Sequence, residues 1–291
     1  MSLTRPLLPA LAVATLLASV WMPGCSGEPT ATPPVDKPPT EAPVDEKAPP
    51  PPALDMAALE ANAVNVALVP SPAEMQKAME KAGIVDGLSK LVTDRALKMD
   101  VENKDVVAVR TGLVLADCLL TVKDAPKEKI VERLGIVKSG MHSLGAGGDI
   151  QATIDELSAR ITNDGISKDD LIKELDDMHG AIIPEIKYEA GDRAVPLIQA
   201  GAWLEGSNLV STAILAANKP DAATQLLRQP QVVDYFLTYV KTEGADKAPD
   251  AVLKQLESTL NKLKEIAAKP TLNVDDVKEI KAQTDSVLAL L

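Results

Sequence analysis

The sequence predicts an all-α domain, a bundle-like arrangement of about eight to eleven helices. Helix start signals recur along the chain, and apolar residues return every three or four positions. No convincing alternation of apolar and polar residues appears, and only 64–69, "VNVALV", is open to either strand or helix. The helical domain is expected over 54–291, long enough for one sizeable core.

In chain order, the first element is an apolar segment over 1–24, where Arg5 is the only charged side chain. Its run "PLLPALAVATLLASVWM" matches the hydrophobic part of a long signal peptide. A membrane-spanning helix usually needs ~20 apolar residues, and Pro6 and Pro9 disfavour one here. We therefore expect a targeting signal rather than part of the fold.

The expected signal ends immediately before Cys25. The preceding letters, "MPGC", resemble the lipobox of bacterial lipoproteins, an aliphatic residue and two small residues before cysteine, with Met22 and Gly24 in the matching places. The resemblance implies cleavage before Cys25 and its acylation by palmitate-type chains, with the domain in the cell envelope facing the periplasm. Several chains hold a protein firmly, whereas one anchors it only marginally. The alternative is a soluble periplasmic protein with an unmodified cysteine.

A proline-rich spacer is expected over 25–53, following the signal. Ten prolines lie within 26–52, among threonine, alanine and charged residues. Such a segment cannot bury a core, so we expect it to be disordered, with polyproline character. At ~3.1 Å per residue it could reach about 80 Å, and it would act as a tether.

The charge balance is acidic, with 30 basic and 42 acidic residues and a formal net charge of −12. Nucleic acid selects for basic surfaces, so we expect no nucleic-acid partner. Anionic lipid headgroups are disfavoured for the same reason. Contact with a membrane is therefore expected through the acyl chains on Cys25.

Helix boundaries follow from capping residues and glycines. Capping patterns place helix starts at Ser71, Ser167 and Asn273. Asp149, in "GAGGD", is expected to cap a further helix after an interhelical turn. Helix ends are expected near four glycines: Gly83, Gly135, Gly140 and Gly180.

The C-terminal forty residues predict an antiparallel helical hairpin. Two apolar stripes step by three and four on either side of Lys269-Pro270: Leu253, Leu256, Leu260 and Leu263, then Val277, Ile280, Thr284 and Val287. Such a narrow stripe packs on its own domain or on a partner helix.

A possible internal duplication relates 103–120 to 192–209 at a constant offset of 89 residues. Asn103 matches Asp192 as a candidate cap, and Gly112 matches Gly201. A glycine within a helix costs ~1 kcal/mol relative to alanine, and close approach of a neighbouring helix is the usual reason for one. Chance similarity of two apolar helices is the alternative.

The second of these helices is expected over 194–217 and should be central, because apolar residues occupy nearly every face. A small, polar stripe runs along it beside Trp203: Gly201, Glu205, Asn208 and Thr212. Trp203, Glu205 and Asn208 are therefore candidates either for an interior polar contact or for the floor of a small-ligand groove. A buried Glu205 needs a charged partner, for which Arg110 is the first choice.

Two motifs carry a further resemblance. "PSPAE" (70–74) and "GAWLEGSNL" (201–209) resemble elements of uncharacterised all-helical lipoproteins of Gram-negative bacteria, which have a Pro-Ser-Pro start and a Gly-x-Trp-x-Glu-Gly helix followed by Leu-Tyr. Asn208 stands where the tyrosine would be, so no tyrosine-dependent role follows. The resemblance implies fold and location, and no known activity.

Motifs for enzymatic chemistry are missing. The two histidines, His142 and His179, and one further cysteine do not suffice for a zinc site, and "GAGGD" lacks the lysine of a P-loop. Cys118 lies among apolar residues and is expected to be buried and inert. We therefore expect no enzyme, cofactor or metal.

Two functional hypotheses remain. The first is a protein-interaction or structural module that meets another envelope protein, favoured by the tether and the acidic surface. The alternative is a small-ligand-binding module with a groove along the helix that carries Trp203 and Glu205.

Overall fold

The computed structural model describes residues 69–84, 87–191, 193–244 and 250–291. The expected signal, Cys25, the spacer and 64–68 lie outside these residues, as does Asp192. The described residues form ten α-helices and two short 3-10 helices, with no strand among them, which confirms the all-α prediction. None of these helices combines the length and apolar character needed to cross a bilayer.

The elements follow one another along the chain. In order they are α2 (Pro72–Lys81), η1 (Leu88–Lys90), α3 (Lys104–Thr121), α4 (Lys127–Leu144), α5 (Gly148–Thr162), α6 (Lys168–Ala190), α7 (Ala194–Ala216), η2 (Pro220–Ala222), α8 (Ala223–Leu227), α9 (Pro230–Glu243), α10 (Asp250–Ala267) and α11 (Val274–Leu288).

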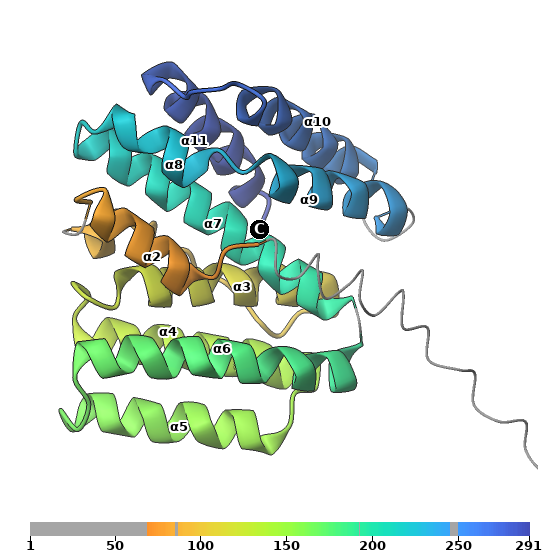
Figure 1. The fold of residues 1–291 in the computed structure, drawn as a ribbon. Helices are drawn as coiled ribbons and strands as arrows, with labels where there is room; N and C mark the ends of the chain where they lie inside the picture. The colour runs from red at the N-terminus through yellow and green to blue at the C-terminus, as the bar shows by residue number, and fades with distance from the viewer. Residues whose placement is uncertain (1–68, 85–86, 192, 245–249) are drawn as a thin grey trace, which may run out of the picture. The chain divides into compact units, whose positions relative to one another are not determined.

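Helix α7 lies at the centre of the domain. It packs most extensively on α3, and it also contacts α2, α6, α8 and α11 (Figure 1). Its side chains are buried on nearly every face, and the residues from Gly201 to Ser211 are all buried. The prediction of a central helix over 194–217 is therefore confirmed to within one residue.

Two glycines set the contact between α3 and α7. A methyl group on Gly112 would lie 1.8 Å from the carbonyl oxygen of Ile198, and one on Gly201 would lie 1.9 Å from that of Val109. The two backbones therefore approach more closely than any other residue would permit. The offset of 89 that relates the glycines also relates Val109 to Ile198, so this crossing is locally two-fold.

The remaining helices cover α3 and α7 on two sides. On one side α4 packs on α3, α5 packs on α4, and α6 contacts both α4 and α7 (Figure 1). On the other side α11 packs on α7, while α10 contacts α9 and α11. The arrangement leaves α9, α10 and α11 gathered near the pair of central helices.

The apolar stripes of the C-terminal region face the domain's own helices. Leu260 and Leu263 are buried in α10, and Val277, Ile280, Thr284 and Val287 are buried in α11. Leu253 and Leu256 are only half-buried. Because α11 packs on α7 and α10 packs on α9, these stripes belong to the core of this chain.

The capping residues lie where the sequence predicts them. Ser71 and Asn273 form complete capping boxes with the third helical residue, Glu74 and Asp276 respectively. The side chains of Asn103 and Ser167 also accept hydrogen bonds from the first turns of α3 and α6. These bonds satisfy main-chain N–H groups that have no partner within a helix.

The glycine predictions are wrong at three of four positions. Gly83 follows α2 with φ of 70°, as expected for a helix end. Gly135 and Gly140 instead lie inside α4, and Gly180 lies inside α6. Gly140 has a packing reason, since a methyl group there would lie 2.0 Å from Thr111 Oγ1 on α3.

The predicted cap at Asp149 is also wrong. Helix α4 ends at Gly145, which adopts φ of 93°, and α5 begins after Gly147 without a side-chain cap. Asp149 lies in the first turn of α5, where its negative charge still suits the positive end of the helix dipole.

Candidate functional site

The polar stripe predicted on α7 does not form one site. Trp203, Glu205 and Asn208 are all buried, but each contacts a different part of the domain. Glu205 faces an arginine and a second acid, Asn208 faces α11, and Trp203 faces an apolar pocket. The three candidates therefore have separate roles.

Glu205 forms a buried ion pair with Arg95, which lies between η1 and α3. Glu205 is 1% exposed, and Arg95 Nη1 lies 2.9 Å from its Oε2. The two atoms are not aligned as a hydrogen bond, so the attraction is mainly between the charges. The expectation that a buried Glu205 has an arginine partner is confirmed.

The prediction that Arg110 is the partner of Glu205 is wrong. Arg110 Nε donates to the main-chain oxygen of Leu291 over 2.8 Å, and its Nη1 donates to that of Lys98 over 2.7 Å. Arg110 therefore ties α3 to the segment after α11.

A second buried acid, Asp117 on α3, completes the Glu205 cluster. Burial raises the pKa of Asp117 well above its usual value, and the charge of Glu205 and a hydrogen bond with Glu205 raise it further. Arg133 and Arg95 oppose this shift. The raised pKa favours the protonated form of Asp117 beside Glu205. The sequence analysis missed Asp117, although it is the only charged residue in "TGLVLADCLLTV".

Cys118, the neighbour of Asp117, is fully buried and unpaired with another cysteine among the described residues. Burial raises the pKa of its thiol to about 12. The thiolate is the reactive form, so Cys118 is inert at neutral pH, as predicted.

Asn208 joins α7 to α11. Its amide nitrogen donates to Thr284 Oγ1 over 3.0 Å and to Asp285 Oδ1 over 2.7 Å. Both of its amide hydrogens are thereby used in a helix–helix contact. Asn208 therefore makes an interior polar contact between two helices.

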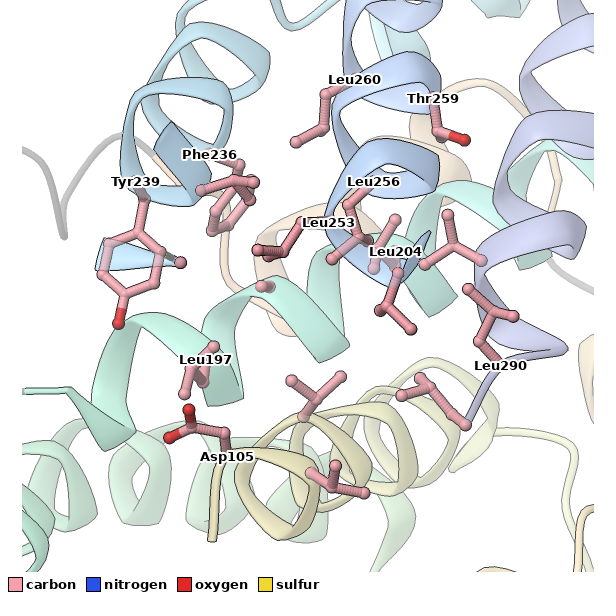
Figure 2. Close-up of a pocket in the computed structure, with 18 of the residues that line it drawn as sticks. Asp105, Leu197, Leu204, Phe236, Tyr239, Leu253, Leu256, Thr259, Leu260 and Leu290 are labelled. Carbon is pink, nitrogen blue, oxygen red and sulfur yellow. The ribbon is translucent and has the colours of Figure 1, made fainter. Parts of the chain in front are cut away.

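An apolar pocket of about 260 Å³ lies between α3, α7, α9, α10 and α11, with a contribution from the last two residues of the chain (Figure 2). Leucine, valine and aromatic side chains form most of its wall. The apolar residues around it include Val106, Val109, Leu197, Trp203, Leu204, Phe236, Val252, Leu253, Leu256, Leu260, Val287 and Leu290.

Trp203 forms a rigid part of this wall. Its indole Nε1 donates to Gln229 Oε1 over 2.7 Å, and its ring lies 5.3 Å from that of Phe236, tilted by 41°. The polar atom of the indole is therefore satisfied away from the apolar wall. The ring system is left to present an apolar surface in a fixed orientation.

One end of the pocket is polar but electrically balanced. Arg193 Nε and Nη2 donate to Asp105 over 3.0 and 2.7 Å, and its Nη1 donates to the carbonyl of Glu243 over 2.6 Å. Tyr239 lies beside them, and burial raises the pKa of its phenol to about 12, so it is neutral at physiological pH. Because the arginine charge is already paired, this end offers no free cation to an anionic ligand.

The pocket combines residues that the sequence analysis did not bring together. It predicted Trp203 as a site residue but not Phe236 and Tyr239 on α9. A local indication existed, because 234–239, "DYFLTY", contains three of the few aromatic residues. Periodicity within single helices could not show that α9 and α10 leave a space above α7.

Comparisons with protein-family models, curated proteins and solved structures found no match to this chain. No group of three or more potential metal ligands occurs in the described part of the chain.

Proposed function

We propose that this protein is a binding module for a small, neutral, apolar molecule of about ten carbons, held in the pocket beside Trp203. The observation that carries the proposal is an apolar pocket of about 260 Å³ where α3, α7, α9, α10 and α11 meet. This develops the alternative hypothesis from the sequence, with Trp203 retained as a site residue and Glu205 and Asn208 assigned to structure.

The size of the proposed ligand follows from the volume. An apolar cavity of ~150 Å³ binds benzene, a molecule of six carbons, so about 260 Å³ suits about ten. Sites for small molecules are mainly apolar, with a few polar groups that orient the ligand. The pocket has this composition, and its arginine is neutralised by Asp105.

The protein-interaction hypothesis has weaker support. Val274 and Leu290 are the only large apolar side chains that are well exposed in the described residues, and Leu290, at 51% exposed, belongs to the pocket. Extended apolar patches are the usual marks of a docking surface. We therefore favour a small ligand over an envelope protein, and insertion of a partner's apolar segment becomes an outcome of the test.

For location, we propose a lipoprotein anchored in the cell envelope through acyl chains on Cys25. The support is the apolar run, the "GC" junction and the proline-rich spacer. In this arrangement the spacer presents the ligand-binding domain to the periplasm. A binding module held at a membrane surface suits apolar molecules, which concentrate in lipid.

Naphthalene provides a test of ligand binding, because it has ten carbons and no polar atom. We expect it to bind the wild-type domain with one molecule per chain, measured by its own fluorescence and by an upward shift of the unfolding midpoint. Ala200 on α7 lines the pocket, and Ala200→Phe should fill the space and abolish binding.

Ala152→Phe serves as the control, because Ala152 is exposed on α5 and lies outside the pocket. It should bind naphthalene as the wild type does. Absence of binding to the wild type, or equal binding by the Ala200→Phe variant, would contradict the proposal. If cross-linking in whole cells instead captured one stoichiometric protein partner that Ala200→Phe releases, the protein-interaction hypothesis would replace it.

A further inference from the structure

One end of the apolar pocket carries charged groups that a ligand can reach. Asp105, in the first turn of α3, and Arg193, just before α7, both line the pocket, and their side chains are 31% and 29% exposed. Tyr239 on α9 lines the same end and is half-buried. Figure 2 shows the Asp105 carboxylate pointing toward Leu197 and Tyr239, at the end of the pocket away from Leu290. A ligand that fills the pocket therefore has one end beside Asp105.

Asp105 and Arg193 form a pair that still has hydrogen-bonding capacity. Arg193 Nε donates to Asp105 Oδ1 over 3.0 Å, and its Nη2 donates to Oδ2 over 2.7 Å. Nη1 donates to the main-chain oxygen of Glu243 over 2.6 Å, which holds the guanidinium at the pocket independently of Asp105. A carboxylate has about four acceptor sites and a guanidinium has about five N–H donors, so both groups can also bond to a ligand.

We propose that the ligand carries one uncharged hydroxyl group at this end, and that Asp105 selects it by accepting its hydrogen bond. This inference depends on the function proposed for the pocket. A hydroxyl group both donates and accepts, so it suits a carboxylate that lies beside the N–H groups of Arg193. A carbonyl or ether oxygen can only accept, and it would leave Asp105 without a donor from the ligand. A hydrogen bond to an ionised acceptor is also stronger than one between neutral groups.

Asp105 also disfavours a ligand with a carboxylate group. Arg193 would otherwise be the partner of such a group, but its charge is already compensated by Asp105. A carboxylate here would lose hydration and would lie beside a second negative charge. An ammonium group would meet the positive charge of Arg193 in the same way. A neutral hydroxyl group avoids both repulsions.

Asp105→Ala provides the test, because it should change the preference of the pocket and not only weaken binding. The change removes the acceptor and leaves the charge of Arg193 uncompensated at the pocket. The variant should bind 2-naphthol about tenfold more weakly than the wild type does, as expected for one lost hydrogen bond to a charged group. It should bind 2-naphthoate several-fold more tightly than the wild type does. Naphthalene should bind both proteins equally, which would show that the pocket is intact.

Two further variants and one further probe sharpen the comparison. Asp105→Asn keeps the size of the side chain and removes its charge, so it should shift the preference in the same direction, and it carries the comparison if Asp105→Ala no longer binds naphthalene. Glu174→Ala is the matched control, because Glu174 on α6 forms a similar two-point pair with Arg160 outside the pocket. It should leave the affinities for all probes unchanged. 2-Methoxynaphthalene, which accepts but cannot donate, should lose no affinity in the Asp105→Ala variant.

The outcomes separate the two proposals. If naphthalene does not bind the wild type, the function proposed for the pocket fails, and the role of Asp105 fails with it. If naphthalene binds but the affinities for 2-naphthol and 2-naphthoate are the same in the wild type and the Asp105 variants, only the role of Asp105 is overturned. Tighter binding of 2-naphthoate than of 2-naphthol by the wild type would overturn the uncharged ligand class.

Discussion

At the scale of single residues, buried charge decides where specific partners are required. Glu205 is paired inside the domain with Arg95 and lies beside Asp117, whose pKa is raised, and the three residues come from separate parts of the chain. Removal of one member of a buried pair leaves the other without compensation, which usually costs more than the pair contributed. Glu205 is therefore a sensitive position for stability.

Glu205→Ala should lower the free energy of unfolding by about 3 kcal/mol or more, because it leaves Arg95 without its partner and opens a cavity. Denaturant melts at neutral pH would measure this effect. Glu132→Ala, which breaks an exposed pair with Lys129 on α4, is the control and should change stability little. Similar behaviour of the two variants would mean that the Glu205 pair is not truly interior.

Asp117 predicts a dependence on pH. Its pKa is raised in the folded protein, so above the ordinary value of 3.8 the unfolded chain releases a proton that the folded chain retains. The unfolded state then binds fewer protons, and Asp117 makes stability fall as pH rises toward its folded pKa, by at most ~1.4 kcal/mol per pH unit. Below pH 3.8 the Asp117 carboxyl group is protonated in both the folded and the unfolded state, so it no longer makes stability depend on pH.

Asp117→Asn should remove that decline. The amide N–H₂ can donate to Glu205 as the protonated acid does, and it does not ionise. The stability of the variant relative to wild type should therefore increase between pH 4.5 and pH 7, measured by urea melts across that range. A constant difference between the two proteins at every pH would show that Asp117 ionises in the folded state as readily as in the unfolded chain.

The burial and pairing of Glu205 could be predicted from the sequence only in part. A buried Glu205 was predicted to need a basic partner, because an acid in an apolar helix needs compensation. The sequence could not distinguish Arg110 from Arg95, since Arg95 belongs to an irregular segment without periodicity.

At the scale of elements, the contact between α3 and α7 depends on two glycines. The sequence offset of 89 predicted that Gly112 and Gly201 serve a close approach, and the structure places each glycine against the backbone of the other helix. The helix starts at Ser71, Asn103, Ser167 and Asn273 were also predictable, because capping is local. Glycine alone did not predict helix ends, since Gly135 and Gly140 lie within α4.

Gly112→Ala or Gly201→Ala should force the two central helices apart and lower the free energy of unfolding by about 3 kcal/mol or more, beyond the usual cost of overpacking. Gly135→Ala is the matched control, because Gly135 is an exposed glycine inside a helix with open space around it. That change should stabilise the domain by up to ~1 kcal/mol through helix propensity. Thermal melts of the three variants would contradict the crossing geometry if all three were stabilised.

At the scale of the whole molecule, the helical class and the central place of α7 followed from composition and periodicity. The pocket could not be predicted from composition and periodicity, because it arises where α9, α10 and α11 meet α3 and α7 without filling the space between them. Each of these helices has an ordinary apolar face. The void depends on their relative positions, which no pattern within one helix specifies.

The proposed anchoring of the whole chain depends on Cys25. If the "GC" junction is a lipobox, Cys25→Ser should prevent acylation, so that the precursor remains unprocessed and is not labelled by radioactive palmitate. Cys118→Ser is the control, because that buried thiol is unreactive and its loss should leave labelling intact. Fractionation of cells producing each variant would measure processing and membrane association together. A Cys25→Ser protein that is processed and partitions with membranes like the wild type would exclude an anchor at Cys25, while leaving the binding of naphthalene by the domain as a separate question for the purified protein.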